Sequence, residues 1–187
     1  MSKIIQFKIQ LLDIDPEIWR RINLPASFTF SGLHAAIQAV MGWEDGHLHM
    51  FTVDGQRYGV PDDDWGSDYE VLEEADHRLN GVLSEGQKFL YVYDFGDDWR
   101  HEITVEEIRE GNSGENLPTC IAGERACPPE DSGGPYFYPE FLDALSDPSH
   151  EDHDHYVDIY GEHDPEGFDL KLAQKYLGAL RPTGSVQ

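Results

Sequence analysis

The sequence predicts an α+β domain in which a mostly antiparallel, hairpin-rich mixed sheet is packed by a few helices. Segments with strand-like alternation occur in pairs that are joined by turn residues, which is typical of hairpins. Helical spacing is confined to a few separate segments, so strands and helices do not alternate as they do in a doubly wound sheet. A length of 187 residues suits one domain with its own core, and we expect residues 1–187 to form it, with a flexible tail at 181–187.

Five elements are predicted in the first third of the chain. Residues 3–12 alternate apolar and polar side chains, and residues 18–24 return as a second strand after an Asp- and Pro-containing turn. A helix over residues 31–41 follows from apolar spacing, with a serine as N-cap and a glycine after its last turn. A strand over 47–53 reaches an Asp-Gly pair, which is a strong hairpin signal into residues 56–58.

The rest of the chain predicts one more hairpin, a long loop and two helices. Strands over 87–93 and 99–108 flank an Asp- and Gly-rich turn. Residues 118–134 contain both cysteines together with several prolines and glycines, which predicts a loop without a helix or a long strand. Helical spacing then predicts helices over 136–145 and 170–180, the second of them capped by an aspartate.

Composition restricts the class of partner and the compartment. With 13 basic and 37 acidic residues the formal net charge is -24, and Arg20-Arg21 is the one adjacent basic pair, so we expect no direct nucleic-acid binding. The charge favours a cation or a basic protein surface, with solubility alone as the alternative. No run of 18 apolar residues and no signal-peptide pattern occur, so we expect no membrane insertion and a cytoplasmic location.

One possible metal site combines both cysteines with two histidines. Cys120 and Cys127 are too far apart in sequence for a zinc knuckle, so His47 and His49 would have to complete a closed, structural site. These histidines are two residues apart and would face the same side of a strand. The alternative is that the thiols are small buried hydrophobes.

A second possible metal site lies in a segment dense in ligand-type residues, namely His150, Glu151, His153 and His155. Imidazoles combined with carboxylates suit manganese, iron, nickel or zinc. The spacing is neither that of a helical metalloprotease motif nor that of an EF-hand loop. A solvated acidic loop is the alternative.

A third candidate site consists of Asp94, Asp97, His101, Glu130 and Asp131. The first three surround the predicted turn and can supply a carboxylate–histidine pair for acid–base chemistry. The last two lie in the long loop, where we expect the buried thiols to anchor the chain and to present both acids at the rim of a cleft. Turn capping is the alternative for all these aspartates.

Two functional hypotheses remain open at this stage. The first is a non-enzymatic module that binds a protein partner, with or without a divalent metal ion; the oligomeric state is open. The alternative is a metal-dependent hydrolase that uses the clustered carboxylates and histidines. No Ser-His-Asp order, Walker loop or dinucleotide fingerprint is present in the sequence. Convergence of the candidate segments on one cleft would favour the enzyme.

Four ordered segments resemble the plasmid pRiA4b ORF-3-like family. They are IDPEIWRRI at 14–22, MGWEDGHLH at 41–49, YDFGDDWRH at 93–101 and ACPPEDSGG at 126–134. The resemblance implies a single α+β domain without an established activity, found on plasmids and chromosomes and sometimes labelled as a resolvase-type passenger of insertion elements. A serine recombinase needs a serine among phosphate-binding arginines, and this acidic chain has eight dispersed arginines.

Overall fold

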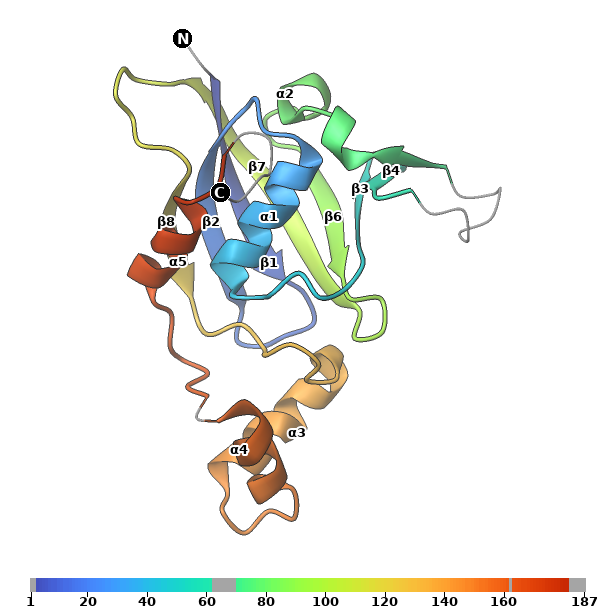
Figure 1. Ribbon diagram of the computed structural model, residues 1–187, viewed down its shortest axis with the longest axis vertical. Coiled ribbons are helices and arrows are strands. Elements are labelled where there is room, and N and C mark those ends of the chain that lie inside the picture. Colours follow the sequence, from blue (N-terminus) through green and yellow to red (C-terminus); the bar gives the residue numbers. More distant parts are fainter. Residues whose placement is uncertain (1–2, 62–69, 162, 182–187) are drawn as a thin grey trace.

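The computed structural model describes residues 3–61, 70–161 and 163–181. The strands are β1 (Lys3–Leu11), β2 (Ile18–Pro25), β3 (His49–Val53), β4 (Gln56–Gly59), β5 (Val71–Glu73), β6 (Lys88–Tyr93), β7 (Trp99–Glu110) and β8 (Thr119–Glu124). They form one eight-stranded sheet in the order β5-β4-β3-β6-β7-β1-β2-β8 (Figure 1). The pairing of β4 with β5 is parallel and the other strand pairs are antiparallel. The α+β prediction is therefore confirmed.

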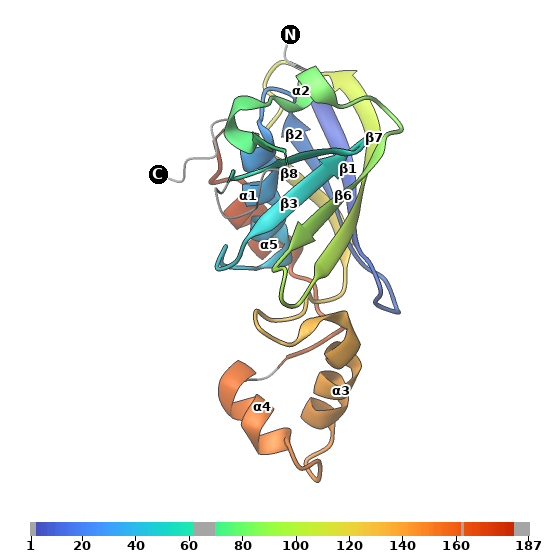
Figure 2. The ribbon, with the colours of Figure 1, turned by 90° about the vertical axis from the view of Figure 1, so that its right-hand side faces the viewer.

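The helices are α1 (Phe30–Met41), α2 (Leu79–Val82), α3 (Gly134–Ser146), α4 (His153–Tyr160) and α5 (Leu170–Leu177), with a short 3-10 helix η2 (Glu74–Asp76) after β5. α1 packs on one face of the sheet, with α5 beside it. α3 and α4 contact each other away from the sheet, as Figure 2 shows. Among the helices that the structure describes, none is long and apolar enough to cross a membrane.

The core lies between the sheet and α1, and the alternation of β1 explains why. Ile5, Phe7 and Ile9 are fully buried, while the intervening Gln6 and Lys8 lie on the opposite, partly exposed face. One apolar face against the helix and one polar face toward solvent is the usual arrangement of an antiparallel sheet. Each apolar side chain buried in this way stabilises the fold by about 1.5–3 kcal/mol.

Local turn and cap chemistry fixes the ends of the elements that lead to the candidate site. α1 is capped by Thr29, whose hydroxyl accepts a hydrogen bond from the Gly32 nitrogen at 3.2 Å, and not by the serine that the sequence suggested. Gly42 ends the helix with a left-handed φ of 88°, as expected. Asp54 and Gly55 both have positive φ, which is the hairpin turn that their pairing predicts.

Two expectations from the sequence are corrected by the structure. The beginning of the long predicted loop is strand β8, which includes Gly123 and forms because this short segment pairs with the edge of β2. Residues 153–160 form α4 where an acidic loop was the alternative. Trp19 lies on the outer face of the sheet and is partly exposed, whereas Trp43 and Trp99 are buried. The predicted flexible tail lies outside the described residues from position 182 onward.

Candidate functional site

Two clusters of potential metal ligands lie around the connection between α1 and β3. The first, here called the stacked-histidine cluster, consists of His34 from α1, Asp45 from the connection, His49 from β3 and Glu74 from η2. One ligand atom each from His34, Asp45 and His49 lies within 4.8 Å of the others. Because three separate elements supply these side chains, packing of α1 on the sheet creates the cluster.

The two imidazoles of this cluster are parallel and in contact. Their ring centroids are 3.4 Å apart with an interplanar angle of 4°. The Nε2 atom of His34 is 2.7 Å from Asp45, and the Nε2 atom of His49 is 2.7 Å from Glu74. Both histidines and Glu74 are buried, but the Asp45 side chain is 64% exposed. The cluster lines a cavity of about 250 Å³, so it has an access route from solvent.

Hydrogen bonds orient His34 and determine its tautomer. The Gln38 amide donates to the Tyr91 hydroxyl at 3.2 Å, and that hydroxyl lies 2.8 Å from His34 Nδ1. Desolvation by burial lowers the pKa of His34, and the hydrogen bond from His34 lowers the pKa of Asp45. Because the ionised Asp45 only accepts, Nε2–H of the neutral ring donates to it, and Nδ1 accepts from the Tyr91 hydroxyl. Metal binding requires a neutral imidazole and an ionised carboxylate, and coordination through Nε2 would require the Nε2 proton to move to Nδ1, which would then donate to the Tyr91 hydroxyl.

The second group, here called the His47 cluster, consists of His47, Asp94, Glu130 and Asp131. Nε2 of His47 lies 3.0 Å from Asp131, 3.7 Å from Asp94 and 3.8 Å from Glu130. One imidazole nitrogen donates at most one proton, so it cannot satisfy three carboxylates at once. His47 also lines the cavity of the stacked-histidine cluster, so the two clusters adjoin.

Polar contacts hold the segment that carries Glu130 and Asp131. Trp43 Nε1 donates to the Pro128 carbonyl at 2.9 Å. The Tyr93 hydroxyl donates to Glu130 at 2.9 Å, and its contact with this carboxylate, after desolvation by burial, raises the tyrosine pKa. A carboxylate oxygen of Asp97 accepts a backbone N–H of the same segment at 3.0 Å. Side chains next to the site, rather than the thiols alone, therefore dock this loop.

The structure brings together some of the predicted site residues and separates others. His47, Asp94, Glu130 and Asp131 converge, although the sequence analysis placed His47 in one candidate site and the three acids together in another. Asp97 accepts a bond from the backbone near the cluster and does not join it.

His101 is not brought to the surface with these acids. It is 0% exposed, with Nδ1 3.1 Å from the Trp99 carbonyl oxygen. Burial lowers its pKa to about 3. His101 is therefore a core residue.

The two other predicted ligand sets do not form groups of three ligands in the described part of the chain. Cys120 and Cys127 are free thiols, and burial raises their pKa values to about 11 and about 12. His150 and Glu151 precede α4, which contains His153 and His155. Nδ1 of His153 is 2.8 Å from a helix carbonyl oxygen, and His155 is exposed.

Sequence reasoning missed His34, Asp45 and Glu74. The available signal was the alternation of Asp45, His47 and His49, which places ligand-type side chains at every second position of one short segment. His34 and Glu74 reach the cluster only through tertiary packing and leave no local signal.

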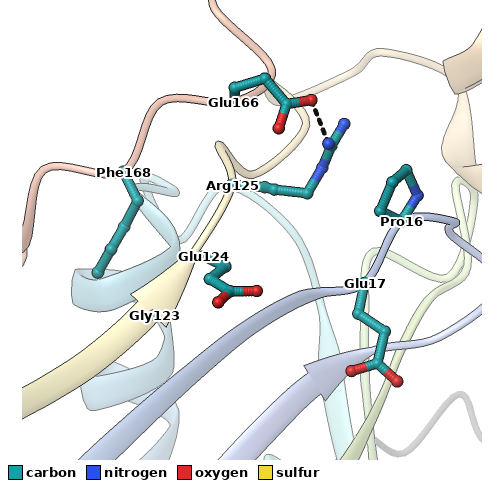
Figure 3. Close-up of a pocket in the computed structure, with 7 residues that line it drawn as sticks. All are labelled: Pro16, Glu17, Gly123, Glu124, Arg125, Glu166 and Phe168. Atoms are coloured by element: carbon teal, nitrogen blue, oxygen red, sulfur yellow. Dashed lines mark hydrogen bonds and ion pairs between the residues drawn. The ribbon is translucent and has the colours of Figure 1, made fainter.

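A separate cavity of about 620 Å³ is lined by the turn between β1 and β2, the end of β8 and the chain before α5 (Figure 3). Its lining residues are Pro16, Glu17, Gly123, Glu124, Arg125, Glu166 and Phe168. Arg125 forms an ion pair with Glu166, and Figure 3 shows the other two carboxylates pointing away from that pair. No member of either ligand cluster lines this cavity, so its larger volume does not make it the candidate site.

Comparison with known proteins identifies the family. Residues 3–172 match the family described as plasmid pRiA4b ORF-3-like protein, and the chain belongs to this family. It is 36% identical over 175 residues to the uncharacterised protein y4hQ of Sinorhizobium fredii, covering 93% of this chain and 89% of that protein. It also resembles the crystal structure of MM3350, a protein of unknown function from Methanosarcina mazei, with a TM-score of 0.82 and 39% identity over 91% of this chain and 97% of the other.

Proposed function

We propose that the protein binds a divalent transition-metal ion through His34, Asp45 and His49 and acts as a metal-dependent hydrolase. The observation that carries the proposal is the presence of two imidazoles and one carboxylate within 4.8 Å of one another, in a cluster lining a cavity of about 250 Å³. Two histidines and one carboxylate are a common ligand set for catalytic zinc and for non-haem iron.

Three protein ligands leave a coordination position for water, which is what hydrolysis requires. Zinc held by His34, Asp45 and His49 would supply Lewis-acid activation of water at neutral pH. Glu74 is hydrogen-bonded to His49 and lines the same cavity. A carboxylate in this position orients the imidazole or adds an oxygen ligand. His47 lines the same cavity and would provide an imidazole for proton transfer there.

Metal binding is tested with Asp45→Asn, because the amide oxygen can still accept the hydrogen bond from His34 while the negative charge is lost. The matched control is Asp54→Asn, since both aspartates have a left-handed φ, 58° and 49°, and Asp54 lies in the exposed turn after β3. Tag-free protein is loaded with zinc or manganese, and metal content and thermal stability are measured. We expect wild type and the control to bind the metal and gain stability, and Asp45→Asn to bind about tenfold or more weakly. Equal binding by both variants, or no binding by wild type, contradicts the proposal.

Hydrolysis is tested separately with chromogenic phosphodiester and carboxylic ester substrates. The metal-loaded wild type and the control should turn over one substrate class, and Asp45→Asn should not. Metal binding without turnover of any of these substrates would support the metal site but contradict the proposed hydrolase activity.

A non-enzymatic protein-binding role is the second candidate, and exposed aromatic residues on α3 favour it. Tyr136 is 85% exposed and Phe137 is 53% exposed, with their rings 5.1 Å apart. Adjacent exposed aromatics are enriched at protein interfaces, and the net charge of -24 suits a basic partner rather than a nucleic acid. The double variant Tyr136→Ser and Phe137→Ser should lose an affinity-purified partner that wild type retains.

The free cysteines fit a reducing, cytoplasmic compartment.

A further inference from the structure

Arg20 is a buried cation on β2, and it belongs to neither of the two metal-ligand clusters. The residue is 2% exposed. Its Nε atom donates to the Val40 carbonyl at 2.9 Å, and Nη1 donates to the carbonyls of Trp19 and Glu124 at 2.8 Å each. These acceptors are neutral backbone groups. The guanidinium is thus held rigidly in place without a hydrogen-bonded counter-charge.

Its charge is not compensated by the described residues. None of the described ion pairs includes Arg20. The guanidinium carbon lies 4.1 Å from the centroid of the Phe168 ring, which gives a cation–π contact. Cys120 and Cys127 are nearby, but burial raises their pKa values to about 11 and about 12, so both thiols are neutral at pH 7. A buried charge left in this way is costly.

The Nη2 edge of Arg20 has no hydrogen-bond partner among the described residues, and Arg20 lines a cavity of about 210 Å³. The walls come from α1, from the chain after β8 and from α5, and they include Ala39, Ala126, Phe168, Leu172, Ala173 and Tyr176. These side chains are largely apolar.

Two other polar groups of the wall already have partners. Asp169 accepts from the Leu172 nitrogen at 2.9 Å, and His163 lies 3.1 Å from the Tyr138 hydroxyl. Arg20 therefore contributes a buried cation to a small, mostly apolar cavity, which is the arrangement expected of a ligand site with an orienting polar group.

We propose that this cavity binds a small organic carboxylate, whose carboxylate group pairs with the Nη2 edge of Arg20 and whose apolar part lies against α1 and α5. The unused edge has two N–H donors, enough for a monoanion. Inorganic phosphate needs more donors than this apolar wall supplies. The inference is independent of metal binding at the stacked-histidine cluster, because it uses none of the same residues.

The test compares carboxylates with their neutral amides, namely acetate, butyrate and benzoate with acetamide, butyramide and benzamide. Binding to the metal-free full-length protein is measured by calorimetry and by thermal shift at constant ionic strength. We expect at least one carboxylate to bind about tenfold or more tightly than its amide. Equal affinity of acid and amide for every pair, no binding of any carboxylate, or binding of phosphate in their place overturns the proposal.

Two leucine variants, each replacing an alanine of α1, locate the binding site without removing the arginine. Ala39→Leu should fill the cavity and weaken carboxylate binding about tenfold or more. Ala35→Leu, one helical turn earlier, lines a neighbouring groove and not this cavity, so it should bind like wild type. Arg20→Met should abolish binding, and if that variant does not fold, the two leucine variants decide alone. Equal weakening by both leucine variants would place the ligand elsewhere.

Discussion

The fully buried His101 predicts a specific loss of stability in acid. Its ring is enclosed by the core, its Nε2 atom has no hydrogen-bond partner among the described residues, and its pKa is lowered to about 3 from the ordinary 6.5. Desolvation by burial is the main cause, because it disfavours the imidazolium form. The perturbation is His101→Phe, which retains an aromatic ring but cannot take up a proton.

The sign and size follow from proton linkage. Above pH 6.5 the imidazole is neutral in both the folded and the unfolded protein, so its contribution to stability is fully present. Between pH 6.5 and about 3 the unfolded chain binds the proton and the folded protein does not, so stability falls as the pH falls. At about 1.4 kcal/mol for each pH unit, the loss between pH 7 and pH 5 is about 2 kcal/mol.

Urea unfolding of wild type and His101→Phe at pH 7 and pH 5 measures this difference. The other titrating groups, including the buried His34, are common to both proteins and largely cancel. We expect the free energy of unfolding of wild type to fall by about 2 kcal/mol more than that of the variant. Packing differences caused by the phenylalanine affect both pH values and also cancel. An equal loss in the two proteins would refute the argument that this imidazole stays neutral in the core.

Three other predictions concern the backbone, a thiol and a surface ion pair. Gly134→Ala should lose about 2 kcal/mol or more, because φ is +79° and the added Cβ would lie 2.3 Å from a carbonyl oxygen. Gly46→Ala has open space and is the control in the same urea unfolding experiment. The Cys127 thiol, with a pKa of about 12, should react with an aromatic disulfide reagent at pH 8 far more slowly in the folded protein than in urea. Arg21→Met removes a partly exposed pair with Glu106 and should cost at most about 1 kcal/mol, less at high salt. Fast labelling of Cys127 in the folded protein would contradict the thiol prediction. A loss of unfolding free energy several-fold larger than this in Arg21→Met would contradict the ion-pair prediction.

Much of the sheet can be predicted from the sequence because its signals are local. The alternation in β1, β6 and β7 and the turn residues beside them specify which face is buried and where each strand ends. The short β5, η2 and α2 carry no comparable periodicity and were not predicted. β8 was hidden among prolines and glycines, because its strand character depends on pairing with the edge of β2.

The candidate site was predictable only where its residues are close in sequence or share a turn. The acids of the His47 cluster were recognised as ligand-type side chains. Their convergence on one imidazole was not predicted. The bond between His49 and Glu74 joins positions 25 apart, and the contact between His34 and Tyr91 joins positions 57 apart. Such pairs are set by how α1 and η2 pack on the sheet, so periodicity and spacing carry no information about them.

One short segment links both ligand clusters, which makes them a single structural unit. Asp45 and His49 belong to the stacked-histidine cluster, while His47 between them faces the acids of the other cluster. Trp43, just before them, donates to the chain that carries Glu130 and Asp131. A displacement of this segment would therefore alter the geometry of both clusters at once. The WEDGHLH segment, which carries part of the resemblance to the family, is thus the part of the chain where fold and proposed chemistry depend on the same residues.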